Sequence, residues 1–180
     1  MKTALKIATI LTWFNLLFWS GFLLLLALSA VASQQMPLLI GVVLLSCIPL
    51  NCYAAVLLQR SIRRPGSKLS SQTPTGIRFV GFVAMFFAIM FVVNGLTFAG
   101  KATEAVKMFK DGIAQLKDAD PRYLQFATPS VFRNIGYIIA FLGICVGINV
   151  MLNFRLLRWY FLVNRSDVRP NDDVRPGDEP

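Results

Sequence analysis

Four long apolar blocks without internal charges constrain the fold of this chain more than any other feature. The blocks cover residues 7–32, 36–58, 77–100 and 131–154. Charged side chains occur only at block edges, as Arg78 and Arg133. A helix needs about 20 residues to cross the ~30 Å hydrocarbon core of a bilayer, and a charge near the centre costs at least about 2.5 kcal/mol. Backbone groups in lipid must also bond within their own segment, so we predict four transmembrane helices. Their expected ranges are about 7–32, 36–59, 77–100 and 131–158.

The composition agrees with a membrane protein. Hydrophobic residues make up 56% of the 180-residue chain and charged residues 15%, against about 45–50% and about 25% in soluble domains. We therefore expect an all-α, polytopic four-helix bundle formed by residues 1–164. Residues 165–180 repeat Asp-Val-Arg-Pro and are too polar to form a core, so a disordered cytoplasmic tail is expected there.

The first block also has features of a secretory signal peptide. Lys2 and Lys6 precede it, and Ala30-Val31-Ala32 matches a small-residue cleavage pattern. However, its apolar stretch exceeds the ~7–15 residues of a signal peptide. We favour a retained helix, and cleavage after Ala32 stays the alternative. The intact mass of the purified protein distinguishes the two.

The basic residues predict the orientation. With both termini inside, 12 Lys and Arg residues lie on the inner side and 6 on the outer side. Of the two short loops, residues 59–78 contain 5 Lys and Arg residues and residues 33–37 contain none, so the 59–78 loop is expected on the inner side. We expect a multi-pass protein of the plasma (cytoplasmic) membrane with both termini in the cytoplasm.

The net charge of +9 has two interpretations, binding to nucleic acid and attraction to anionic lipids. A basic chain can bind nucleic acid, but these basic residues lie mostly beside the membrane spans and no basic domain is present. Attraction to anionic lipid head groups, about 1 kcal/mol per basic residue, explains them better. The bilayer is the expected partner, and nucleic acid is not.

The segment Ser46–Tyr53 ("SCIPLNCY") places Cys47 and Cys52 five residues apart. On a helix this offset turns the two thiols about 140° away from each other. Cys145 is the only other thiol and histidine is absent, so a metal or redox site lacks ligands. We interpret the segment as a transmembrane helix kinked at Pro49, which removes one backbone hydrogen bond.

Asparagines occur at similar depths in three of the predicted spans. Asn15, Asn51 and Asn149 lie roughly 9–14 Å inside the cytoplasmic boundary, at 1.5 Å per residue. We hypothesise that they meet in the bundle and bond to one another or to the carbonyl freed by Pro49. The alternatives are that each is satisfied separately by its own backbone, or that the three form a substrate or ion site.

Small residues on the fourth span predict close helix packing. They are Gly136, Ala140, Gly143 and Gly147, and the third span carries a similar face. Small side chains let helix backbones approach closely. We favour packing between these two spans over a homodimer interface, which stays the alternative.

The segment between the third and fourth spans predicts an amphipathic helix on the extracytoplasmic side. Its apolar stripe consists of Val106, Phe109, Ile113 and Leu116, and Pro121 should end it. The helix is expected to lie on the membrane surface or cap the bundle.

The function predicted from these features is non-enzymatic. No charged residue lies deep in a span, and no haem-ligand, phosphate-loop or nucleophile motif is recognisable. We expect no catalytic residue, metal or cofactor, and an accessory or scaffold subunit that contacts other membrane proteins or itself. The alternative is a small oligomeric channel or transporter for a neutral or lipid-like substrate.

Overall fold

The computed structural model describes residues 2–63, 73–115 and 127–165, and these residues form helices without any strand. The helices are α1 (Lys2–Ser33), α2 (Met36–Leu45), α3 (Cys47–Arg63), α4 (Thr73–Gly100), α5 (Ala102–Ala114) and α7 (Pro129–Arg165). Four continuous helical stretches in this part of the chain are long and apolar enough to cross a membrane: α1, α2 with α3, α4 and α7. The predicted all-α helical bundle is confirmed. The expected disordered tail and the stop at Pro121 lie outside the described residues.

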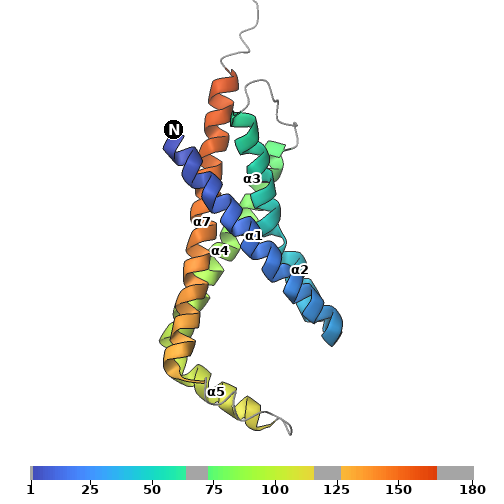
Figure 1. Ribbon diagram of the computed structural model, residues 1–180, viewed down its shortest axis with the longest axis vertical. Helices are drawn as coiled ribbons and strands as arrows, with labels where there is room; N and C mark the ends of the chain where they lie inside the picture. Colours follow the sequence, from blue (N-terminus) through green and yellow to red (C-terminus); the bar gives the residue numbers. More distant parts are fainter. Residues whose placement is uncertain (1, 64–72, 116–126, 166–180) are drawn as a thin grey trace, which may run out of the picture.

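The bundle is built around the pair α4–α7. These two helices run side by side and make the most extensive contact in the molecule, while α1 crosses them and also packs on α3 (Figure 1). The far half of α1 leaves the pair together with α2 (Figure 1). No residue of α2 is buried, so the core lies where α1, α3, α4 and α7 meet.

The second span is interrupted between α2 and α3. Pro49 has no N–H to donate to the carbonyl of Leu45, four residues earlier, and its ring crowds that carbonyl. Bonds from Ser46 N to Val42 O (3.0 Å) and from Leu50 N to Ser46 O (3.1 Å) continue the ladder on either side. The break lies at Ser46, in the turn before Pro49, and the Ser46 hydroxyl donates to Val43 O at 2.6 Å.

Glycines set the distance between α4 and α7. A Cβ on Gly95 would lie 2.6 Å from Ala140 N, and one on Gly136 would lie 2.6 Å from Gly95 O. A Cβ on Gly143 would lie 2.8 Å from Ala88 O. Because most of these atoms belong to the helix backbone, a side chain at any of these positions would require the two helices to move apart. The small residues of α7 therefore pack within the chain, against α4.

Gly147 differs from the other glycines of α7. A Cβ there would meet only Ala88 Cβ at 3.7 Å and Met85 Sδ at 3.9 Å, which are ordinary contacts. The two helices are thus less tightly packed at this point.

Helix α5 follows α4 after Lys101, begins at the end of the α4–α7 pair and points away from it to the side (Figure 1). Val106 is buried, and the Phe109 ring contacts the Phe132 ring of α7 at a centroid distance of 5.5 Å. The predicted amphipathic helix is therefore present and anchored by its apolar side. Leu116, the last residue of the predicted stripe, lies outside the described residues.

Candidate functional site

Polar side chains gather where α1, α3 and α7 meet, over about 12 Å along α3 from Asn51 to Gln59. The set consists of seven buried residues: six carry an amide or hydroxyl group, and the seventh carries a thiol. We call the set the polar network; its members are Thr12, Asn15, Asn51, Cys52, Gln59, Asn149 and Asn153.

Asn149 of α7 is the centre of the polar network. Its Oδ1 accepts hydrogen bonds from Thr12 Oγ1 at 2.7 Å and from Asn153 Nδ2 at 3.3 Å. Its Nδ2 lies 3.5 Å from Cys52 Sγ. One side chain thus links α1, α3 and α7.

Gln59 of α3 closes these bonds into a ring. Its Nε2 donates to Thr12 Oγ1 at 3.0 Å and to Asn153 Oδ1 at 3.4 Å. The ring therefore runs through Thr12, Asn149, Asn153 and Gln59. In a hydrocarbon environment such internal bonds are required, because no water replaces a missing partner.

Asn15 forms a second link between α1 and α7. Its Nδ2 donates to Leu11 O at 2.9 Å and to Cys145 O at 3.3 Å. Its Oδ1 and the Oδ1 of Asn51 have no hydrogen-bond partner among the described residues. The Asn51 oxygen faces Gly81, where a Cβ would lie 3.3 Å away.

The three asparagines named from the sequence are therefore all buried at the helix junction, but no bond joins any two of them in the described part of the chain. Asn15 bonds to the carbonyls of Leu11 and Cys145 rather than to that of Leu45.

Asn149 bonds directly to Thr12, Asn153 and the Cys52 thiol. Within the described residues, Gln59 bonds to Thr12 and Asn153 and to none of the three asparagines. Neither Thr12 nor Gln59 is among the residues predicted from the sequence. Thr12 lies one turn before Asn15, which is the signal that could have identified it.

One charged residue lies beside the polar network. Arg63, near the end of α3, donates from Nη2 to Thr9 Oγ1 at 2.7 Å, and Thr9 donates to Leu5 O at 2.7 Å. Thr9 precedes Thr12 by three residues on α1, so the arginine joins α1 to α3 beyond the ring. This position suits the membrane boundary, where a long side chain can reach water.

The three thiols are free and lie apart from any metal-binding set. Cys52 and Cys145 are buried, and Cys47 is half-buried. Among the described residues, no group of three His, Cys, Asp or Glu side chains could hold a metal ion. The chemistry available in the polar network is hydrogen bonding between neutral groups.

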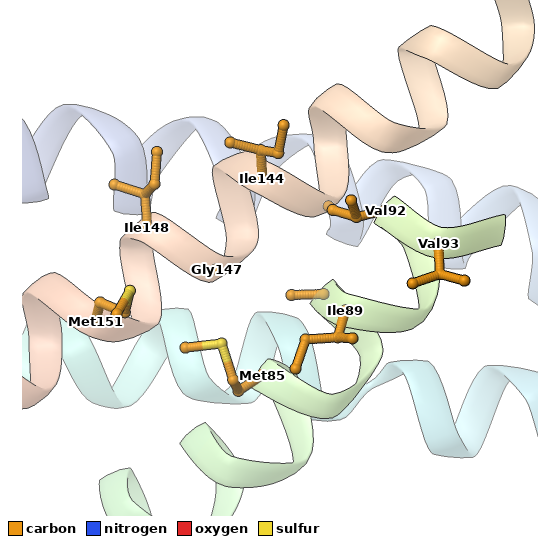
Figure 2. Close-up of a pocket in the computed structure, with 10 residues that line it drawn as sticks. Met85, Ile89, Val92, Val93, Ile144, Gly147, Ile148 and Met151 are labelled. Atoms are coloured by element: carbon orange, nitrogen blue, oxygen red, sulfur yellow. The ribbon is translucent and has the colours of Figure 1, made fainter. Parts of the chain in front are cut away.

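A second feature is an apolar groove between α4 and α7, with a volume of ≈ 290 Å³. Figure 2 shows Met85 and Ile89 of α4 on one side and Ile148 and Met151 of α7 on the other, with Gly147 between them. We call it the α4–α7 groove; its lining residues are Met85, Ala88, Ile89, Val92, Val93, Gly143, Ile144, Gly147, Ile148 and Met151.

Four helical stretches of the described chain have the length and composition of membrane spans, as expected of a multi-pass membrane protein. The sequence matches no protein-family model, and no curated protein or solved structure is significantly similar to it.

Proposed function

We propose that this protein is a non-enzymatic accessory or scaffold subunit that acts through lateral contacts between helices in the plasma membrane. Both termini and the 59–78 segment face the cytoplasm in this proposal, in agreement with the positive-inside rule. The observation that supports it best is an exposed stripe along α1.

The stripe follows a helical seam of alternating four- and three-residue steps. Its members all lie on the exposed side of α1. We call it the α1 seam; it consists of Ile10, Phe14, Leu17, Gly21, Leu24, Leu28 and Val31. This spacing keeps one helix face toward a partner in left-handed packing, which most membrane bundles use.

Gly21 gives the α1 seam a hole among large side chains. A Cβ there would meet no atom within 4 Å, whereas Gly95, Gly136 and Gly143 all contact the opposite helix. Leu17 and Leu24, on either side of it, are 68% and 63% exposed. Small residues let membrane helices approach, so a glycine between two leucines suits an incoming helix.

The polar network supports a structural rather than a catalytic role for the interior. Its ring members satisfy one another, and they hold α1 against α3 and α7. A rigidly placed α1 presents the α1 seam in one orientation. We propose that the partner is a transmembrane helix of another protein.

Site-specific photo-cross-linking tests this function. A photoreactive residue at Leu24 should give one protein adduct of defined mass in native membranes. The control is the same residue at Ile138 of α7, which is 58% exposed. Along its helix, Ile138 lies about 26 Å from Arg155, and Leu24 lies about 27 Å from Lys6. Ile138 should give no protein adduct.

A second variant extends the same experiment. Gly21→Ile fills the hole and should abolish the Leu24 adduct, whereas Gly76→Ile, at a glycine that also has open space, should retain it. Equal adducts at Leu24 and Ile138, or none at either, would contradict the proposal. An adduct with a second copy of the chain would replace the accessory role by self-association.

A channel or transporter for a neutral solute is the second candidate, and one observation favours it. Asn15 Oδ1 and Asn51 Oδ1 are buried acceptors without a partner in the described residues, and a passing solute could donate to them. Flux of a neutral solute through pure protein in liposomes, lost in Asn51→Leu, would support this candidate. Absence of flux together with a Leu24 adduct would support the scaffold.

A further inference from the structure

We infer that the α4–α7 groove binds one acyl chain of an anionic phospholipid, whose phosphate lies among Arg78, Arg155 and Arg158. This inference is independent of the proposed function, because the α1 seam and the groove lie on different helices. It rests on the size of the groove, its lining, and the charges at one of its ends.

The size of the groove fits a single hydrocarbon chain. Its walls run from Met85 to Val93 on α4 and from Gly143 to Met151 on α7, about 12 Å at 1.5 Å per residue. A volume of ≈ 290 Å³ over that length describes a narrow groove, in which one hydrocarbon chain can lie. A helix, about 10 Å wide, could place only side chains in it.

The lining suits an acyl chain as well. All ten lining residues are apolar, and Gly147 and Ala88 leave the space that larger residues would fill. Met85 and Met151 stand at the same end of the groove, on opposite helices (Figure 2). Their unbranched side chains can adapt to a flexible chain.

Arginines continue the two walls beyond that end. Arg155 and Arg158 follow Met151 by four and seven residues, and Arg78 precedes Met85 by seven, so each lies on the same helix face as its methionine. All three are exposed, at about 6–11 Å beyond the groove along the helices. The Arg78 guanidinium lies 5.6 Å from the centre of the Phe161 ring, which brings the end of α4 to α7.

The charges at this end favour a phosphate group. Neither α4 nor α7 contains an Asp or Glu, so no acidic side chain of these helices neutralises the arginines. A guanidinium presents parallel donors that match phosphate oxygens. A lipid with its chain in the groove would place its head group at this membrane surface, where the arginines are.

Native mass spectrometry of the full chain tests the inference. The protein is reconstituted in bilayers with equal amounts of phosphatidylglycerol and phosphatidylcholine of the same chain length, then released with a mild detergent. We expect one retained phosphatidylglycerol per chain, enriched several-fold over phosphatidylcholine. Each basic residue near an anionic surface contributes up to about a fivefold preference.

Matched variants separate the two halves of the binding site. Gly147→Leu fills the groove and should abolish retention of either lipid, whereas Gly147→Ala, which makes only ordinary contacts, should keep it. Arg155→Gln with Arg158→Gln should remove the preference for phosphatidylglycerol. Arg133→Gln, at the opposite end of α7, should leave the preference unchanged.

Three results would overturn the inference. The first is retention of phosphatidylglycerol and phosphatidylcholine in equal amounts by the unaltered chain. The second is an equal loss of preference in Arg133→Gln and in the Arg155/Arg158 variant, which would indicate a general surface charge effect. The third is a dimer that Gly147→Leu dissociates, because the groove would then hold a second copy.

Discussion

Replacing Gly136 with alanine should force α4 away from α7 and lower the free energy of unfolding by about 1–3 kcal/mol. The added Cβ would lie 2.6 Å from both Ala99 N and Gly95 O, and 2.8 Å from Ala99 Cβ. Two of these atoms belong to the α4 backbone, so relief requires a shift of the whole helix. Since α4–α7 is the most extensive contact in the molecule, the shift weakens the core of the bundle.

Unfolding by sodium dodecyl sulfate in mixed micelles, followed by circular dichroism, measures this loss. Gly41→Ala in α2 is the matched control, because a Cβ there meets no atom within 4 Å. Alanine is also the better helix former by about 0.8–1.0 kcal/mol, so the control should be neutral or stabilising. Equal stability of the two variants would show that Gly136 does not lie at a close helix contact.

The second large effect is expected from Asn149→Leu. This change removes the acceptor of Thr12 and Asn153 and the donor to Cys52 in one step. Buried groups left without a partner cost about 1–3 kcal/mol, more than the ~0.6 kcal/mol of an average interhelical bond in a membrane. We expect a loss of about 1–2 kcal/mol in the same unfolding measurement.

Thr97→Val is the control for Asn149→Leu. Thr97 is exposed, and among the residues that the structure describes its hydroxyl bonds only to Val93 O of its own helix, at 2.8 Å. Its removal should change stability by less than about 0.5 kcal/mol. A loss in Asn149→Leu no larger than in Thr97→Val would mean that the polar network does not hold the helices together.

The helical fold could be predicted from the sequence because charge exclusion from a bilayer is a strong, local signal. The helices extend beyond the predicted ranges, as in α7, which reaches Arg165 rather than residue 158. Hydrophobicity marks only the part of a helix inside the hydrocarbon, and the backbone hydrogen bonds continue through the interface. The break at Ser46 precedes Pro49 because the missing bond belongs to Leu45 O.

The polar network could be predicted only in part. Asn15, Asn51 and Asn149 stand out as amides in apolar spans, but their partners depend on helix rotation, which a sequence does not give. Thr12 gave only a weak signal, its position one turn before Asn15, because threonine is common in membrane helices and can bond to its own backbone. Gln59 gave none because it adjoins Arg60, where polar residues are expected.

The α1 seam and the α4–α7 groove could not be predicted for a related reason. Apart from the side that carries Thr12 and Asn15, α1 is apolar all round, so the sequence does not tell which of its apolar faces stays exposed after α3 and α7 have packed. The groove depends on Gly147 being less tightly packed than Gly143, although both belong to the same G-x-x-x-G spacing. Only the relative position of the two helices distinguishes them.

The bond between Thr12 and Asn149 joins α1 to the α4–α7 pair and should stabilise the bundle. A double-mutant cycle of Thr12→Val and Asn149→Leu tests it most directly, with the free energy of unfolding as the measurement. The control cycle pairs Asn149→Leu with Thr97→Val. Thr97 lies near the contact of Gly95 with Ala140, and Ala140 is about 14 Å from Asn149 along α7. We predict a coupling of about 0.5–1.7 kcal/mol in the first cycle and additivity in the second. Additivity in both cycles would contradict the account.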